Sequence, residues 1–187
     1  MTIDKAIILS AGQGSRLLPL TANMPKCLIK IDGKAILDHQ LDALKAAGVD
    51  HNVVVGGYRF EKLAAHVAAR ADGTSVRLNP FWLAASSISS VWAARDLLDG
   101  DFALLNGDTV YAAQAQYRSL GIIVGREDKG LYRAALDAVI SREGGILNFH
   151  HAIVAEIARQ DGVHAIIVDR DDWIEIDRPE DIAAWHD

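Results

Sequence analysis

The feature that most constrains the fold is a regular alternation of two sequence patterns. Short apolar runs stop at glycine or asparagine, and the segments between them carry apolar residues at helical spacing. We therefore expect strands at 5–10, 53–55, 76–78 and 102–105, and helices from Ile36 to Gly48, over 59–70 and over 88–98. This alternation predicts an α/β fold with a mostly parallel sheet and helices on both faces. In the last of these helices, Ile88, Val91, Trp92 and Leu98 are expected to face inward.

Composition narrows the class of protein. The chain has 187 residues, half of them hydrophobic, which suffices for one substantial core. We interpret residues 1–187 as one domain because we find no repeat, low-complexity tract or linker. No apolar run approaches the ~20 residues of a membrane span, and we expect neither a signal peptide nor a membrane partner. The net charge of −6 argues against a nucleic-acid surface, and the single Cys27 is compatible with a cytoplasmic location.

The first expected strand leads into a glycine loop suited to a triphosphate. Gly12 and Gly14 let backbone N–H groups approach phosphate oxygens, and Arg16 and Lys26 supply positive charge. A P-loop would need Lys-Ser/Thr directly after its second glycine, but Gly14 is followed by Ser15 and Arg16. A dinucleotide fingerprint would need a third glycine at position 17, which is Leu17. Both are therefore excluded. A plain strand-to-helix glycine turn is the alternative for the two glycines alone.

Arg16 and the pair Pro25-Lys26 extend the motif beyond its glycines. With them the chain resembles the nucleotide-sugar and phosphocholine nucleotidyltransferases, whose signature reads Gly-x-Gly-x-Arg followed by Pro-Lys. The resemblance implies a Rossmann-like three-layer sandwich of the nucleotide-diphospho-sugar transferase type. It also implies transfer of a nucleotidyl group from an NTP to a phosphorylated acceptor, with Mg²⁺ as cofactor and pyrophosphate as product.

Two aspartates match the magnesium-binding positions of that family. Asp108 follows the apolar run 102–105, and Asp177 lies in a Glu-Ile-Asp-x-Pro-Glu-Asp stretch. A turn-forming role is the alternative for Asp108, and a helix N-cap is the alternative for Asp177. Pro179 and the acidic residues after it suit the start of a helix. Mg²⁺ needs few carboxylates when phosphate and water complete its shell.

The resemblance assigns a role to each candidate site residue. Arg16, Lys26, Asp108 and Asp177 are the catalytic set, and Asp108 and Asp177 would bind the metal. Lys26 would reach the α-phosphate. The nucleotide would contact Leu9, Ser10, Ala11, Gly12, Gly14, Arg16, Lys26, Gly57, Tyr58, Ser87 and Asp108.

Residues 79–94 bear on the choice of substrates. Asn79-Pro80-Phe81-Trp82, followed by a serine-rich helix start, is similar to cytidylyltransferases that use phosphocholine or related alcohol phosphates. A serine-capped helix is the alternative for Ser86 and Ser87. CTP with such an acceptor is therefore the first expectation, with transfer to a sugar 1-phosphate close behind. Four tryptophans could supply a cage for a quaternary ammonium, although core or surface packing is the commoner role.

The later part of the chain departs from the family pattern. Segment 109–118 is several dozen residues shorter than the usual acceptor-side insertion, so a weakened nucleotide-binding domain is a third possibility. Ala152 stands where an acceptor-binding carboxylate is expected. His150 and His151, placed on a helix, would point about 100° apart and would not share a metal. The residues leave the oligomeric state open.

Overall fold

The computed structural model describes residues 3, 5–111, 121–125, 130–160, 162–165 and 173–185. Its centre is a five-stranded sheet in the order β5-β4-β1-β6-β8. The first four are parallel and the edge strand β8 is antiparallel to β6. Their bounds are Lys5–Ser10 for β1, His51–Gly56 for β4, Ser75–Leu78 for β5, Phe102–Asn106 for β6 and Ile122–Val124 for β8. The predicted strands and the α/β class are confirmed.

The strand order predicts a ligand site at the end of β1. The chain runs outward from β1 through β4 to β5 and then returns to β6 on the other side of β1. Ile7 pairs with Val53 on one side and with Leu104 on the other. At such a reversal the connections after the strands diverge, which opens a crevice at their carboxyl ends.

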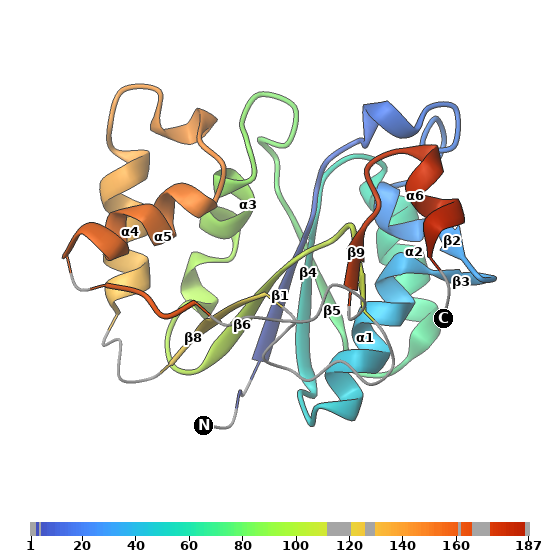
Figure 1. Cartoon of the computed structure of the whole chain (residues 1–187), viewed down its shortest axis with the longest axis horizontal. Coiled ribbons are helices and arrows are strands. Elements are labelled where there is room, and N and C mark those ends of the chain that lie inside the picture. Colours follow the sequence, from blue (N-terminus) through green and yellow to red (C-terminus); the bar gives the residue numbers. More distant parts are fainter. Residues whose placement is uncertain are drawn as a thin grey trace.

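Helices cover both faces of the sheet (Figure 1). The long helices α1 (Ile36–Ala46) and α2 (Phe60–Arg70) lie on one face. The other face carries α3 (Ile88–Ala93), α4 (Leu131–Ile140) and α5 (His151–Gln160). Short 3₁₀ turns occur at Ser15–Leu17 (η1), Lys26–Leu28 (η2), Arg95–Leu97 (η3) and Gly145–Leu147 (η6). Within the described ranges, no helix is long and apolar enough to cross a membrane.

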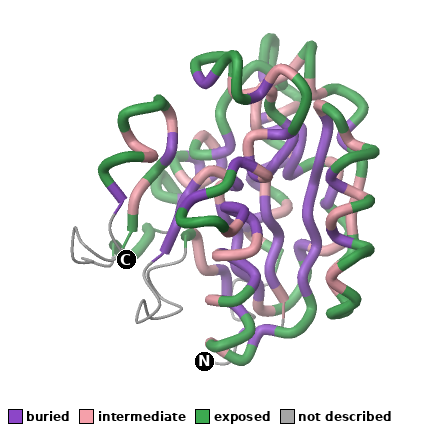
Figure 2. Tube along the Cα trace, turned by 90° about the vertical axis from the view of Figure 1, so that its right-hand side faces the viewer, coloured by how far each residue is buried: buried purple, intermediate pink, exposed green. Residues whose placement is uncertain are grey.

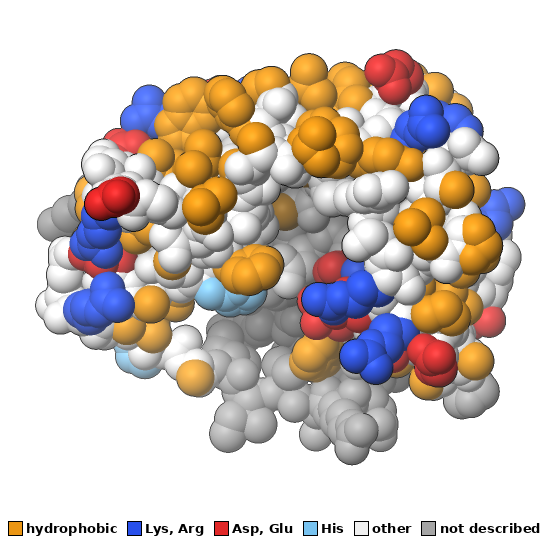
Figure 3. All heavy atoms as spheres, turned by 90° about the horizontal axis from the view of Figure 1, so that it is seen from above, with side chains coloured by type: hydrophobic (Ala, Val, Ile, Leu, Met, Phe, Trp, Pro, Cys, Tyr) orange, Lys and Arg blue, Asp and Glu red, His pale blue; other side chains and the backbone are white. Residues whose placement is uncertain are grey.

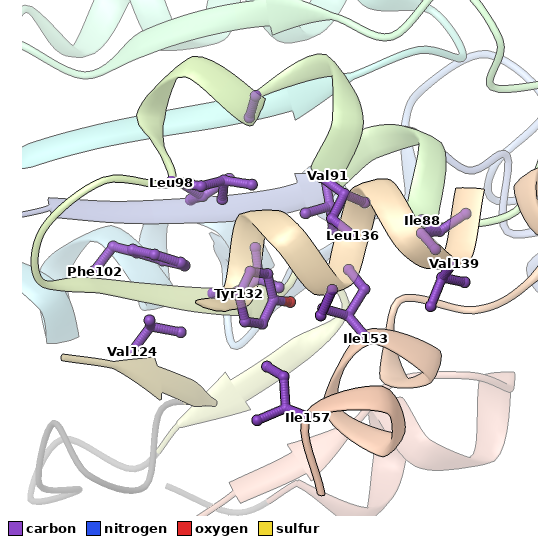
Figure 4. Close-up of a cluster of buried hydrophobic side chains, with 14 of the residues drawn as sticks. Ile88, Val91, Leu98, Phe102, Val124, Tyr132, Leu136, Val139, Ile153 and Ile157 are labelled. Carbon is purple, nitrogen blue, oxygen red and sulfur yellow. The ribbon is translucent and has the colours of Figure 1, made fainter. Parts of the chain in front are cut away.

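Neighbouring residues of β1 supply two separate cores. Ile8 packs toward α1 and α2, whereas Ile7 packs toward α3, α4 and α5. The central strands are accordingly buried on both sides, while the outer helix surfaces are exposed (Figure 2). In the second core Tyr132 meets Phe102 edge to face, with ring centroids 5.5 Å apart, among aliphatic side chains from α4 and α5 (Figure 4). Continuous apolar strands therefore give a sheet enclosed between helix layers.

A third, smaller cluster joins the N-terminal loop to the C-terminal segment. It contains Leu17, Ile31, Val110, Ile176 and Trp185. The elements around it are the hairpin β2 (Lys30–Ile31) and β3 (Lys34–Ala35), the antiparallel pair β7 (Thr109–Tyr111) and β9 (Trp173–Glu175), and α6 (Pro179–Ala184). The short strand and the Pro-initiated helix expected near Asp177 are both present.

One sequence expectation about α3 is wrong. The helix ends at Ala93 and continues as the 3₁₀ turn η3, so it does not run over 88–98. Ile88, Val91 and Leu98 are buried as expected, but Trp92 is 40% exposed. Because Trp92 follows the inward-facing Val91 by one residue, it lies about 100° around the helix. Its ring instead contacts Phe81 edge to face, with centroids 6.1 Å apart.

Candidate functional site

A cavity of about 490 Å³ opens at the carboxyl ends of β1 and β6. Viewed from this end, basic and acidic side chains cluster on one flank of a hollow, and a histidine side chain lies on the other (Figure 3). Ten of the predicted site residues line the cavity: Leu9, Ser10, Ala11, Gly12, Gly14, Arg16, Lys26, Ser87, Asp108 and Asp177. Segments far apart in the sequence therefore meet where the strand order predicts a ligand.

The glycine loop is held in a fixed conformation next to Lys26. Gly14 has φ +67°, a left-handed value that favours glycine. Its carbonyl oxygen accepts hydrogen bonds from Thr21 Oγ1 and the Leu17 backbone N–H, both at 2.9 Å. A Cβ on Gly14 would lie 3.0 Å from Lys26 Cβ. Gly12, by contrast, faces open space, because a Cβ there would meet no atom within 4 Å.

Lys26 lies between the two aspartates. Its Nζ donates to Asp108 Oδ2 at 2.9 Å and to Asp177 Oδ1 at 2.7 Å. The Lys26 side chain is only 12% exposed, whereas Arg16, which pairs with Asp177 Oδ2 at 2.9 Å, is 68% exposed. The sequence predicted that Arg16 and Lys26 both supply positive charge to the phosphates. The structure has one exposed arginine and one largely buried lysine that is paired with both carboxylates.

Backbone pairing brings the two aspartates together. β7 and β9 pair antiparallel, with Thr109 opposite Glu175, and the Ile176 N–H donates to the Asp108 carbonyl at 2.9 Å. The Asp177 N–H donates to Asp181 Oδ2 at 2.8 Å. Arg178, rather than Asp177, occupies the N-cap of α6. The N-cap alternative for Asp177 is therefore wrong, and its carboxylate is free to face the cavity.

Gln40, which sequence reasoning missed, and Gly107 shape the turn bearing Asp108. Gln40 is fully buried, and its Nε2 donates to the carbonyls of Asn106 (2.6 Å) and Thr109 (2.8 Å), on either side of Asp108. A Cβ on Gly107 would collide with Ser10 Oγ and lie 2.7 Å from the Leu9 carbonyl oxygen. A signal for Gln40 was available, because it is a polar residue within the apolar stripe of α1.

The charges of the site perturb its carboxylates in opposite directions. The hydrogen bond from Lys26, together with its charge and that of Arg16, lowers the pKa of Asp177. Partial burial and the charges of Asp108 and Asp177 raise the pKa of Glu175, which also lines the cavity. Sequence reasoning treated Glu175 only as a strand residue. Burial raises the pKa of the Cys27 thiol to about 12, so Cys27 is protonated at neutral pH and is no nucleophile.

The aspartates have the chemistry of a magnesium site. Asp108 Oδ1 is buried and has no hydrogen-bond partner, and Asp108 Oδ2 and Asp177 Oδ1 contact the same ammonium. The described residues contain no group of three or more His, Cys, Asp or Glu able to hold a metal ion. Mg²⁺ prefers a few carboxylates completed by phosphate oxygens and water. The two aspartates therefore fit Mg²⁺ bound together with a phosphate-bearing substrate.

The remaining predicted residues lie in two different settings. Ser87 lines the cavity, and its hydroxyl is hydrogen-bonded to the His150 ring. Gly57 and Tyr58 are not among the residues that line the cavity, because Trp82 packs over Gly57 and meets the Tyr58 ring edge to face at 5.5 Å.

The expectation that the His150 and His151 side chains point about 100° apart on one helix is wrong. His150 precedes α5 rather than lying in it, and the centroids of the two rings are 4.1 Å apart. Residues 112–118, most of the short acceptor-side segment, lie outside the described residues.

A family model matches most of the chain, and individual relatives match parts of it. The model of the MobA-like NTP transferase domain matches residues 6–166. UTP–glucose-1-phosphate uridylyltransferase AglF of Haloferax volcanii is 33% identical over 123 residues, which are 66% of this chain and 49% of that protein. CTP:phosphoglutamine cytidylyltransferase of Campylobacter jejuni is 55% identical over 53 residues, 28% of this chain and 21% of that protein. The matches thus span half or less of these curated relatives.

Solved structures share the fold at low sequence identity. CTP:phosphocholine cytidylyltransferase (LicC) from Streptococcus pneumoniae superimposes with a TM-score of 0.83 at 16% identity, covering 98% of this chain and 97% of that one. The inositol-1-phosphate CTP transferase from T. maritima gives a TM-score of 0.72, also at 16% identity, covering 97% and 92%. The three-layer arrangement is therefore that of nucleotidyltransferases.

Proposed function

The chain belongs to the MobA-like NTP transferase domain family, and from this premise we propose that it is a Mg²⁺-dependent nucleotidyltransferase. Its substrates would be an NTP, CTP in the first place, and a small phosphorylated alcohol. The observation that carries the proposal is the position of Lys26, between Asp108 and Asp177 and against the glycine loop. One cavity thereby holds cations for phosphate and carboxylates for a metal.

The reaction needs no protein nucleophile. A phosphate oxygen of the acceptor attacks the α-phosphorus of the NTP, the bond to the β-phosphate oxygen breaks, and pyrophosphate leaves. Both attacking and leaving groups are already ionised at neutral pH, so no proton has to be transferred. Catalysis then depends on alignment and on stabilising negative charge. This requirement agrees with a site built from Arg16, Lys26 and two aspartates rather than from a base and a nucleophile.

Each group has a role that follows from its position. The β- and γ-phosphates would lie at the open face of Gly12 beside Arg16, and Lys26 would reach the α-phosphate. Asp108 and Asp177 would hold Mg²⁺. When bound, that ion would neutralise phosphate charge and help to align the two substrates. Leu9, Ser10 and Ala11 would border the nucleoside.

The choice of CTP and an alcohol phosphate is supported by the serine-rich segment 79–94 and by the relatives. A cytidylyltransferase for phosphoglutamine and one for choline phosphate are among the partial matches. A sugar-1-phosphate nucleotidyltransferase is the second candidate, since the uridylyltransferase AglF matches over a longer part of the chain. A nucleotide-binding domain with weak turnover is the third, motivated by the short segment 109–118.

Pyrophosphate release measured across four NTPs and a panel of phosphorylated acceptors separates these candidates. The panel should contain phosphocholine, polyol phosphates and hexose 1-phosphates, each tested with and without Mg²⁺. The proposal predicts Mg²⁺-dependent release that requires both CTP and an alcohol phosphate. Release with UTP or GTP and a hexose 1-phosphate would favour the second candidate. Nucleotide binding without release from any pair would favour the third.

A further inference from the structure

His150 occupies the cavity wall formed by the segment between η6 and α5. The residue is 5% exposed and lines the cavity together with Phe149 and His151. The carboxylates that line the same cavity are Asp108, Glu175 and Asp177, which follow β6 or lie in and beyond β9. The reaction proposed above assigns His150 no role. It is therefore a buried titratable group in the site that awaits an explanation.

Ser87 contacts both the backbone N–H and the ring nitrogen Nδ1 of His150. The His150 backbone N–H donates to Ser87 Oγ at 2.9 Å, and the same oxygen lies 3.0 Å from His150 Nδ1. A hydroxyl that accepts the backbone N–H keeps its own proton, which it can donate to Nδ1. In that arrangement the ring hydrogen is on Nε2. Burial, reinforced by the neighbouring His151, lowers the pKa of His150 to about 4, so the ring is neutral at pH 7.

The Nε2–H group remains available to a ligand. Within the described part of the chain, His150 forms its side-chain hydrogen bond through Nδ1 and none through Nε2. Nε2 is also not among the buried polar atoms that lack a partner, which means that it is accessible. Since His150 is otherwise buried and lines the cavity, the accessible side of Nε2 is the side toward the cavity.

The surroundings of His150 favour an uncharged oxygen over a cation. The cavity residues from Trp82 to α3 are Trp82, Ala85, Ser86, Ser87 and Ser90, and those around the start of α5 are Phe149 and His151, with no carboxylate among them. A fixed N–H donor presents the positive end of its dipole. It therefore attracts a hydroxyl, ether or carbonyl oxygen and does not attract a trimethylammonium group.

We propose that His150 binds the acceptor, donating its Nε2–H to an oxygen atom of the alcohol moiety, so that the site selects hydroxyl-bearing phosphates over phosphocholine. The inference rests on the proposed nucleotidyl transfer and narrows its acceptor. Ser87 acts as a positioning residue, because it touches His150 and its hydroxyl can donate to Nδ1. An oxygen of the nucleoside offers the same chemistry, so nucleotide and acceptor must be measured separately.

His150→Phe and His150→Gln test the assignment. Phenylalanine keeps a ring but has no donor, whereas glutamine restores an N–H near the position of Nε2. His164→Phe is the matched control, because His164 is exposed and does not line the cavity. Calorimetry in the presence of Mg²⁺ gives the Kd of CTP. A second titration, with a non-hydrolysable CTP analogue already bound, gives the Kd values of inositol phosphate, glycerol phosphate and phosphocholine. Acceptor KM values from pyrophosphate release complete the set.

Because His150→Phe loses one hydrogen bond, we expect it to bind the hydroxyl-bearing acceptors about tenfold more weakly than the wild type does. CTP and phosphocholine should bind as in the wild type, His150→Gln should recover most of the loss, and the control should change nothing. A weaker Kd for CTP with unchanged acceptors would assign the donor to the nucleoside and overturn the proposal. Preference of the wild type for phosphocholine would also overturn it. Absence of pyrophosphate release would refute the transferase function alone, because the binding measurements would still test His150.

Discussion

At the scale of single residues, Lys26 has two partners that a metal ion would also need. Its ammonium contacts both Asp108 and Asp177, and its side chain is largely buried. A divalent ion at these carboxylates and the ammonium in its present position would repel each other. Nucleotide phosphates offer Lys26 an alternative partner. The free protein should therefore bind metal weakly and gain affinity for it once a nucleotide is present.

Lys26→Met tests this competition, because methionine keeps much of the side-chain packing against Gly14 and removes the charge. Without the ammonium, the two carboxylates should bind Mn²⁺ at least roughly tenfold more tightly in the absence of nucleotide. Free Mn²⁺ measured by electron paramagnetic resonance gives the affinity directly. Lys30→Met, which removes an exposed lysine outside the cavity, is the control. Equal or weaker Mn²⁺ binding by Lys26→Met would show that Lys26 does not compete with the metal.

The sequence predicted which charged residues meet but not how they pair. Arg16, Lys26, Asp108 and Asp177 were recognisable from motifs, and the structure brings all four to one cavity. The bond of Lys26 to both aspartates could not be predicted, because it depends on the β7–β9 pairing across a long sequence separation. The contact between Ser87 and His150 has the same origin, since it joins α3 to the turn before α5.

At the scale of the elements, the glycines in the turns after β1 and β6 are required for different reasons. Gly107 is needed because β1 passes so close that a Cβ would collide with Ser10. Gly12 faces open space, which the proposed function assigns to the nucleotide phosphates. The same substitution should therefore have opposite consequences in the two turns.

Gly107→Ala should destabilise the protein by about 1–3 kcal/mol, since the overpacked turn must shift. Gly12→Ala should leave the free energy of unfolding nearly unchanged but weaken CTP binding, because its methyl group would occupy the phosphate position. Urea unfolding and calorimetry with CTP measure the two quantities for both variants. The assignment of the Gly12 loop fails if Gly12→Ala binds CTP as tightly as the wild type does.

The turn before α5, which carries His150, should make stability depend on pH. His150 has a pKa of about 4 in the folded protein and about 6.5 in an unfolded chain, so the unfolded state binds more protons between these values. The corresponding stability is fully present above pH 6.5 and declines as the pH falls toward 4, by up to about 3 kcal/mol. His150→Gln should lose this part of the pH dependence. Urea unfolding at pH 7 and pH 4.5 measures the slope, and identical slopes for both proteins would refute a neutral buried imidazole.

At the scale of the whole molecule, the sequence predicted the central strands and the helix layers better than it predicted the edge strands and the ends of the elements. Apolar runs identified β1, β4 and β6, because strands buried on both faces are continuously apolar. The edge strand β5 was identified by a short run that stops at Asn79-Pro80, although its residues are half-buried or exposed. The edge strand β8 and the pair β7–β9 have weaker patterns, and their positions depend on long-range pairing. The end of α3 was misjudged because helical spacing continues through the 3₁₀ turn that follows it.

The most direct test of nucleotidyl transfer at Asp108 and Asp177 is to identify the product by ³¹P nuclear magnetic resonance. The wild-type protein with CTP, Mg²⁺ and a polyol phosphate should give the two phosphorus resonances of a CDP-alcohol together with pyrophosphate. Asp108→Asn should form the same product at least ~10²-fold more slowly, because the charge stabilisation that depends on its carboxylate would be lost. Asp177→Asn should behave likewise. Formation of the product at the wild-type rate by Asp108→Asn would contradict this account of the site.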